Sequence, residues 1–251
     1  MIVRGLLFAA LLISATSAQA RVFNINNETF AAYFDVSAGP SAIGTGAFDG
    51  EATGLSYSGG SGYNYSGEFG FLYTRQYMSL RFGLEIIRPS AIEGSSATNA
   101  SETELYTADS QILGYAPKLG VEFNLQSNAR SRSFVALGVG AASVTMKNSY
   151  TLTTDGQTAF PGVSNHDVEA KGSGTLLNAS LGYEGLLTDT TTIVVEMGYR
   201  QLNIENLEYT KSVTTFKGPV SSGDKVTTAA GEQRDLNLSG AFIAIGFRFY
   251  L

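Results

Sequence analysis

Ten charged residues fall on one parity of strand-like segments, where they have the chemistry of a buried ion-pair network. Six are acids and four are bases, and the same parity otherwise holds mostly Gly, Ala and Ser. Charges that leave water must pair with opposite charges. We therefore expect one interior network, formed by Asp35, Glu68, Arg81, Glu85, Lys118, Glu122, Glu184, Glu196, Arg200 and Arg248.

The partners within this network should lie on different strands. Arg81 and Glu85 are four residues apart, as are Glu196 and Arg200. Four residues of extended chain cover about 13 Å at about 3.3 Å per residue, which is too far for direct pairing. The pattern therefore predicts ion pairs across the interior.

Catalysis has one candidate in the sequence, the single histidine. His166 stands in the segment "VSNHDVE" beside Ser164, Asn165 and Asp167. A Ser/His/Asp site needs contacts of about 2.6–3.2 Å held by rigid elements, and neighbours on an irregular loop need not converge. We interpret His166 as a solvated loop residue and predict that the chain is not an enzyme.

Cofactor, metal and nucleic-acid sites are not indicated. The segment "GLSYSGGSGYNYSG" lacks the lysine and following helix of a phosphate loop. The acidic pairs Asp49 with Glu51 and Glu102 with Glu104 lack calcium-loop spacing. With 16 Lys and Arg against 22 Asp and Glu, the formal net charge of −6 is wrong for nucleic acid.

Strands are the elements that must position the charged residues. In the closing run "AFIAIGFRFYL", Ile243, Ile245, Phe247 and Phe249 alternate with Ala244, Gly246 and Arg248. Such alternation places the two sets on opposite faces of a strand. The same pattern predicts eight strands, near residues 29–39, 62–73, 77–88, 112–124, 134–145, 175–187, 193–200 and 241–251. Pro40 should interrupt pairing after the first of them unless it lies at a bulge. The start of the first strand, and whether the count is eight or ten, stay open.

The connections between these segments alternate in length. Short links are predicted near 74–76, 126–132 and 188–190, and long polar links near 47–61, 89–109, 147–171 and 203–234. Short turns on one end and long loops on the other are typical of outer-membrane barrels, with the turns in the periplasm.

The uncharged parity decides between lipid and a protein core. It carries no Asp, Glu, Lys or Arg in the strand centres, whereas a soluble sandwich, the alternative, would send its charges outward into water. The expected fold is all-β: an eight-stranded antiparallel up-and-down transmembrane β-barrel with short periplasmic turns and four long extracellular loops. Strand-end tyrosines are expected to form interfacial girdles, namely Tyr63, Tyr73, Tyr77, Tyr115, Tyr183 and Tyr199.

The N-terminus predicts the compartment. Arg4, the apolar run 6–13 and Ala18-Gln19-Ala20 have the order of a secretory signal with its cleavage site. We therefore expect a cleaved signal at 1–20 and a barrel domain at 21–251, located in the outer membrane.

The last six residues carry a family resemblance. Gly246, Phe249 and Leu251 resemble the C-terminal assembly signal of bacterial outer-membrane barrels, although Ala244 and Leu251 replace the usual polar residue and terminal Phe. Together with the strand pattern, the chain resembles the OmpA-like or opacity-type eight-stranded barrels. The resemblance implies as partners outer-membrane lipid and lipopolysaccharide, the barrel-assembly machinery, and a host or environmental surface ligand for the loops.

Three functions are open at this point. The first is a barrel closed by its charges that displays loops for adhesion, surface interaction or envelope integrity. The second is a narrow cation-preferring channel, since Ala136, Gly138, Gly140 and Ala142 could leave a gap beside the acids. The third is a loop-based lipid or peptide hydrolase.

Overall fold

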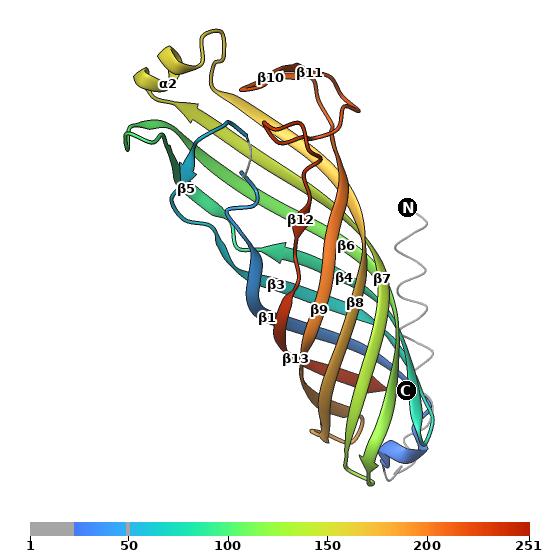
Figure 1. Ribbon diagram of the computed structural model, residues 1–251. Coiled ribbons are helices and arrows are strands. Elements are labelled where there is room, and N and C mark those ends of the chain that lie inside the picture. Colours follow the sequence, from blue (N-terminus) through green and yellow to red (C-terminus); the bar gives the residue numbers. More distant parts are fainter. Residues whose placement is uncertain (1–22, 49–50) are drawn as a thin grey trace, which may run out of the picture.

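Eight long strands form a closed antiparallel ring in the computed structural model, which describes residues 23–48 and 51–251 (Figure 1). Each strand pairs with its neighbours in chain order, and β1 pairs with β13 to close the ring. The ring strands are β1 (Phe30–Gly44), β3 (Ser61–Thr74), β4 (Met78–Pro89), β6 (Glu104–Ser127), β7 (Ser131–Leu152), β8 (His166–Leu186), β9 (Thr191–Tyr209) and β13 (Gly240–Tyr250). The predicted all-β, eight-stranded up-and-down barrel is confirmed. The predicted signal at 1–20 and Asp49 lie outside the described residues.

The first strand contains the proline that made its prediction uncertain. Pro40 faces outward and pairs with Tyr63, and the register between β1 and β3 then shifts before Gly44. Proline has no N–H to give to a ladder, so a break of register is where a strand tolerates it. The barrel strand therefore continues past Pro40 instead of ending there.

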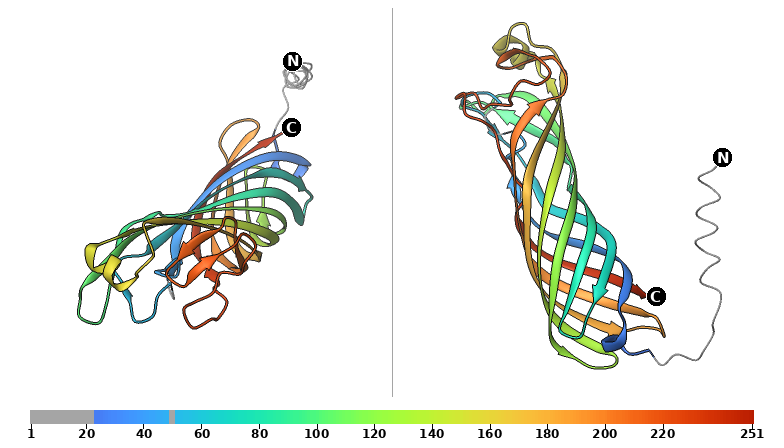
Figure 2. Two further views of the ribbon diagram at one scale, coloured as in Figure 1. Left: turned by 90° about the horizontal axis from the view of Figure 1, so that it is seen from above. Right: turned by 90° about the vertical axis from the view of Figure 1, so that its right-hand side faces the viewer.

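Shorter elements decorate the end of the barrel that carries the long connections. They are β2 (Ser56–Tyr57), β5 (Ile92–Thr98), α2 (Thr154–Ala159), the hairpin of β10 (Val213–Thr215) with β11 (Gly218–Val220), and β12 (Leu236–Asn237). β5 adds to the edge of β6, and β12 pairs with β9. A 3-10 helix at Ile25–Asn27 lies at the opposite end (Figure 2). No helix in the described part of the chain is long and apolar enough to cross a membrane.

Four strands are much longer than the sequence pattern suggested. β6, β7, β8 and β9 contain 24, 22, 21 and 19 residues. The loops predicted at 147–171 and 203–234 were therefore drawn too wide, because both include strand. Four long connections remain on one end, at 45–60, 90–103, 153–165 and 210–239, with short turns on the other. A strand needs only about 9–11 residues to cross a membrane, so these strands extend the wall beyond the hydrocarbon layer. Figure 2 shows the resulting elongated barrel.

The outer wall of the lower barrel is an apolar belt of exposed side chains. Soluble proteins rarely leave such a continuous apolar surface uncovered, whereas a membrane barrel turns it toward lipid. The belt includes Phe34, Val36, Phe69, Phe71, Phe82, Leu119, Leu137, Val139, Leu181, Met197, Ile243 and Ile245, each exposed by 48–60%. Of the predicted girdle tyrosines, Tyr63, Tyr77, Tyr115, Tyr183 and Tyr199 are likewise exposed on this wall, and Tyr73 is half-buried.

The apolar side of the wall changes parity above the belt. On β7, Leu137 and Val139 face outward, but Val144 and Met146 face inward and are buried. The outward positions at the same level are polar, namely Thr145 and Lys147. Since a strand alternates regularly, the exchange means that the outer solvent has changed from hydrocarbon to water.

Strand β9, which is separated from β7 by β8, makes the same exchange. Met197 and Tyr199 are exposed, whereas Leu202 and Ile204 are fully buried inside the wall. Above the belt the protein is thus folded like a water-soluble β-structure, with its apolar side chains inside. We call this upper part the extracellular cap.

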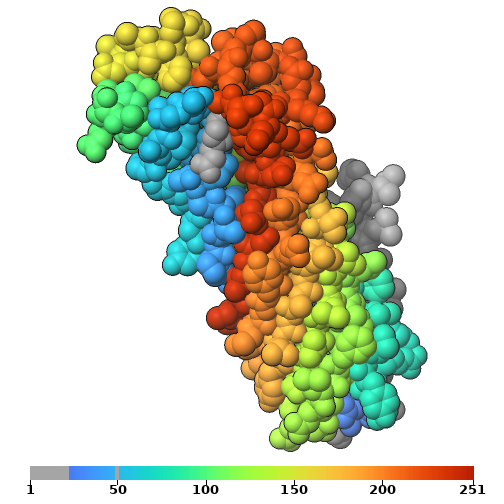
Figure 3. All heavy atoms as spheres, viewed as in Figure 1, coloured from blue at the N-terminus to red at the C-terminus, as the bar shows by residue number. Residues whose placement is uncertain are grey.

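Two loops fill the interior of the cap. Ala47 and Phe48 come from the first loop, and Val226 and Leu238 from the last, and all four are fully buried. Phe216 of the last loop stacks on Tyr106 of β6 with ring centroids 4.4 Å apart. Figure 3 shows the orange and red atoms of the last loop gathered over this end of the molecule.

The opposite mouth is covered by the residues that precede β1. Phe23 and Ile25 are buried in a cluster with Tyr33, Leu72 and Tyr250 of the barrel interior. The Ile25 amide donates to the carbonyl of Ala129 in a short turn, at 3.1 Å, and Asn26 is hydrogen-bonded to Ser127. The N-terminal segment therefore lies across the periplasmic opening.

Candidate functional site

The interior of the lower barrel is the most strongly charged place in the described structure. All ten charged residues predicted for the interior project from the inward parity of their strands. Their side chains are at most 11% exposed. They form two clusters, which we call the upper and the lower cluster.

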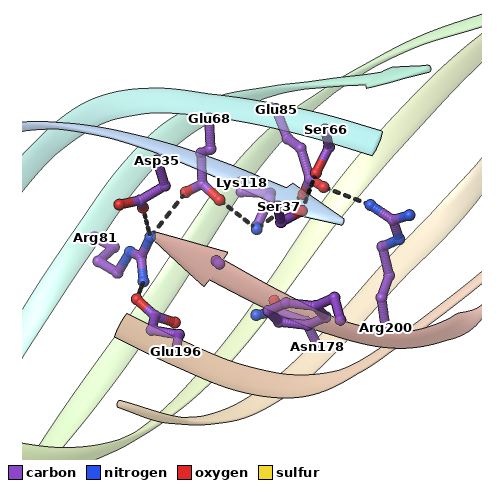
Figure 4. A pocket seen from close by; sticks show the side chains of 12 residues that line it. Asp35, Ser37, Ser66, Glu68, Arg81, Glu85, Lys118, Asn178, Glu196 and Arg200 are labelled. Atoms are coloured by element: carbon purple, nitrogen blue, oxygen red, sulfur yellow. Dashed lines mark hydrogen bonds and ion pairs between the residues drawn. The ribbon is translucent and has the colours of Figure 1, made fainter. Parts of the chain in front are cut away.

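The upper cluster is organised around Arg81 of β4. Its guanidinium donates to Asp35 Oδ2 at 2.6 Å and to Glu196 Oε1 at 2.7 Å (Figure 4). These carboxylates come from β1 and β9, so one arginine ties three strands across the lumen. Charge-assisted contacts of this length are the strong class of hydrogen bond.

Lys118 extends the upper cluster to the other side of the lumen. Its ammonium lies 2.6 Å from Glu68 Oε2 and 2.9 Å from Glu85 Oε2, and Arg200 reaches the other oxygen of Glu85 at 2.6 Å. The Tyr33 hydroxyl donates to Glu68 at 2.5 Å. Each of the two glutamates is thereby held by partners on other strands, as the spacing along single strands requires.

The lower cluster contains a base that the sequence pattern had placed in a turn. Glu122 and Glu184 lie between Arg248 and Arg132, and Arg248 contacts both of them at 2.7 Å. Arg132 contacts Glu184 at 2.6 Å and Glu122 at 3.1 Å and is itself fully buried. The ring of Phe134 lies beneath both guanidinium groups, with centroid distances of 5.6 and 5.0 Å.

Arg132 was missed because the predicted turn at 126–132 was too long. The segment around Arg132 is polar on both parities, so its hydropathy does not mark where the strand begins. The position of Arg132 could have been recognised from parity alone, since Arg132, Phe134 and Ala136 share the inward parity of β7. With Arg132 included, five bases face six acids in the two clusters.

The two clusters join into one network that leaves little free space. Arg81 lies 3.5 Å from Glu122, and Arg248 lies 3.8 Å from Glu196. The cavity beside the upper cluster has a volume of about 30 Å³, enough for one or two water molecules. The gap expected next to the small residues of β7 is smaller still, at about 10 Å³.

The catalytic candidate does not assemble, and the expectation that His166 is a solvated loop residue is wrong, because His166 is half-buried at the start of β8. His166 Nδ1 lies 2.8 Å from the Ser164 backbone oxygen, and the Ser164 hydroxyl points to the Asn165 carbonyl. Asp167 instead accepts a hydrogen bond from Ser149 on the neighbouring strand. The imidazole is stacked on the ring of Tyr150, with centroids 5.0 Å apart, so it packs as an aromatic side chain.

Gly246, predicted as part of an assembly signal, also makes room for the network. It faces the lumen on β13 opposite Asp35, and a Cβ at this position would overlap the Asp35 carboxylate. Phe249 and Leu251, the other two residues of that signal, are exposed on the outer wall.

The replacement Gly246→Ala is expected to destabilise the barrel by about 1–3 kcal/mol, because Asp35 must move away from Arg81. Urea unfolding of the protein in micelles measures the change. Gly62 is the matched control, since its Cβ would meet open space. An equal loss for Gly62→Ala and Gly246→Ala would contradict the steric explanation.

A second buried ion pair lies in the cap, apart from the lumen network. Arg234 of the last loop donates to Glu51 of the first loop at 2.8 Å, and the Tyr150 hydroxyl donates to the same oxygen at 3.0 Å. The Glu51 side chain is 2% exposed and that of Arg234 is 3% exposed. This Glu51–Arg234 pair fastens both loops to the wall at β7.

The fold and the interior together define a class: a membrane-spanning β-barrel of the outer-membrane type. Lipid-compatible side chains surround the lower wall, and the ionic groups are confined to its interior. At the level of the clusters, the described residues leave only the small cavities of about 30 and 10 Å³.

Comparison with known proteins gives matches among solved structures alone. No protein-family model and no curated protein sequence matches the chain. OprG from Pseudomonas aeruginosa has 12% identity and a TM-score of 0.46 over 89% of this chain and 96% of its own. Neisserial surface protein A has 12% identity and a TM-score of 0.40 over 88% and 97%. Ail of Yersinia pestis has 10% identity and a TM-score of 0.39 over 89% and 99%.

OprG is described as an outer membrane protein, NspA as a surface protein and Ail as an attachment invasion locus protein. The strand count and the closed ring of the present chain rest on its own pairing pattern.

Proposed function

We propose that the chain is a closed outer-membrane barrel that anchors and displays an extracellular cap for surface interaction, adhesion or envelope integrity. The observation that carries this proposal is obstruction at three successive levels. The segment with Phe23 and Ile25 covers the periplasmic mouth, the charged network fills the lumen, and the loop residues around Phe48 fill the cap.

The narrow cation channel is the competing function, and the structure gives it little support. The six lumen acids are engaged by five bases, so a passing cation would have to displace buried arginines from carboxylates. Removal of one partner from such a pair is costly, at about 3–5 kcal/mol. Opening would also require the cap core and the N-terminal segment to leave their places.

Recording from single molecules in planar bilayers tests the closed lumen. We expect no steady openings from the folded mature protein at physiological salt. A porin reconstituted in the same membranes is the positive control, and a heat-modifiable gel shift verifies that the barrel is folded. Steady cation-selective steps from the wild type would overturn the proposal.

The remaining partners are proposed on more general grounds. Gly246, Phe249 and Leu251 are proposed as the signal read by the barrel-assembly machinery, and the apolar belt as the surface for outer-membrane lipid and lipopolysaccharide. A host or environmental surface ligand would meet the polar loops of the cap. We propose no enzymatic role, since His166 has no serine hydroxyl or carboxylate beside it among its hydrogen-bond partners.

A further inference from the structure

The basic residues of the barrel strands divide unequally between the two sides of the wall. Arg81, Lys118, Arg132, Arg200 and Arg248 point into the lumen. The other three strand cations, Arg88, Lys147 and Lys171, point outward. All three lie on one side of the barrel, on β4, β7 and β8, and all lie toward the loop end of their strands.

The strand register places these cations on two adjacent rungs. Leu113 of β6 pairs with Thr145 of β7, which pairs with Lys171 of β8. Arg88 continues this rung, because the preceding Ile87 pairs with Gly114. At about 4.8 Å between strands, Arg88 and Lys171 are about 14 Å apart at the backbone. Two long side chains can span that distance around one headgroup.

Lys147 stands one rung higher, between Gln111 of β6 and Glu169 of β8. Its ammonium is 3.6 Å from Glu169, and its side chain is 64% exposed. Lys211 of the last loop holds the same carboxylate at 3.2 Å. The Glu169 carboxylate is therefore held by two lysines.

A hollow lies on the outer wall between these residues. It has a volume of about 470 Å³ and is lined by Arg88, Pro89, Leu113, Thr145, Lys147 and Glu169, among others. Within the described residues, the side chains of Arg88 and Lys171 make no ion pair or hydrogen bond with another residue. Arg88 lines this partly apolar groove, whereas Lys171 lies next to it on the same rung, between Thr145 of β7 and Glu208 of β9.

The height of the groove identifies the chemistry of its occupant. Leu113 and Gln111 of β6 line it. The next outward residue of β6 below is Tyr115, at the upper edge of the apolar belt, and the next one above is Asp109. Acyl chains therefore end at this level, where anionic headgroups begin, and cations at such a boundary attract them.

We propose that the groove lined by Arg88 and Lys147, with Lys171 beside it on the wall, binds the phosphorylated headgroup of an outer-leaflet glycolipid. Its phosphates lie against the cations, and one acyl chain runs down the wall along Leu113 and Tyr115. The orientation of the barrel in the outer membrane comes from the proposed function, on which this inference rests.

Lipid titration in micelles, followed by native mass spectrometry, tests the proposal with the folded mature protein and the double variant Arg88→Gln with Lys171→Gln. The probe is lipopolysaccharide that retains its lipid A phosphates. Each cation near an anionic lipid contributes about fivefold, so we expect about 25-fold weaker binding for the double variant. The matched control, Arg75→Gln with Arg130→Gln, removes two exposed arginines from the short turns at the other end and should bind like the wild type.

Two further arms define the contradicting outcomes. Dephosphorylated lipopolysaccharide should bind the wild type as weakly as the intact lipid binds the double variant. Equal binding by the double variant and the control would overturn the site, and equally tight binding of phosphatidylglycerol would overturn the assignment to a glycolipid. A heat-modifiable gel shift verifies folding of each variant. Conductance in planar bilayers is independent of this surface, so failure of the closed lumen would be recognised separately.

Discussion

Replacing Arg248 by methionine is expected to lower the free energy of unfolding by about 3–5 kcal/mol. Arg248 is 1% exposed and contacts Glu122 and Glu184 at 2.7 Å each. Methionine fills similar volume but supplies no charge, so the buried Glu122 and Glu184 would share Arg132, with Arg81 3.5 Å from Glu122. Urea unfolding in micelles, together with the temperature of the heat-modifiable gel shift, measures the loss.

Two companion variants show whether charge pairing is the cause. Arg130→Met removes an exposed arginine from the neighbouring short turn and should change stability by less than about 0.5 kcal/mol. Arg248→Lys keeps the charge but loses the planar fork that reaches both glutamates, so it should fall between the wild type and methionine. If Arg248→Met and Arg130→Met unfold at the same urea concentration, the lower cluster does not stabilise the barrel.

The replacement Arg234→Met is expected to release the first and last loops while the membrane barrel stays folded. Burial opposes the charge of Arg234, but the Glu51 carboxylate raises the pKa of Arg234 above its ordinary value, so the guanidinium stays charged. Its loss would leave the Glu51 carboxylate buried without its closest cation, at a cost of about 3 kcal/mol. That energy corresponds to a rise on the order of 100-fold in the opened population.

Limited proteolysis of the folded protein reads this opening directly. Cleavage within residues 45–60 and 210–239 should accelerate, while unfolding of the barrel stays unchanged because the pair lies in the cap. Lys225→Met is the control, since Lys225 is an exposed cation of the same loop. Loops that remain equally resistant in both variants would show that the aromatic packing around Phe216 holds them without the ion pair.

The lower barrel was predictable because its pattern is simple. In the belt, the outer wall faces lipid, so every second residue of a strand must be apolar, as Phe69 and Phe71 or Ile243 and Ile245 are. The inward parity then collects the charges by exclusion, which is how Arg81 and Glu196 could be assigned to one interior from opposite ends of the chain. Which base meets which acid depends on the register and tilt of eight strands, and no single segment contains that information.

The cap was not predictable by the same rule. Residues such as Val144, Met146 and Ile204 continue the alternation but carry their apolar side chains inward, opposite to the belt. If a strand is predicted from apolar residues on one parity, it ends where the exchange occurs. The part of the strand above the exchange is then predicted as loop. The alternation itself did continue on β7, and an exchange of parity without loss of period was the available signal.

Loop contacts lay further beyond sequence reasoning. Glu51 and Arg234 are 183 residues apart and face each other only because the barrel closes. Neither belongs to an alternating segment, so local pattern gave no reason to pair them. The sequence suggests for Glu51 only an acidic pair with Asp49, whereas in the structure its carboxylate forms an ion pair with Arg234.

The exchange of parity on β7 and β9 also fixes how deeply the molecule sits. If the barrel sank by two residues, the polar Thr145 and Asn203 would approach the hydrocarbon layer. If it rose, the charged Arg75 and Arg130 of the short turns would approach that layer from the other side, while Tyr199 entered water. Both displacements are unfavourable, so the vertical coordinate has a single minimum. The level at which apolar side chains change from the outer to the inner face of the strands therefore sets the depth of the barrel in the membrane. The height of the cap above the membrane surface follows from that depth.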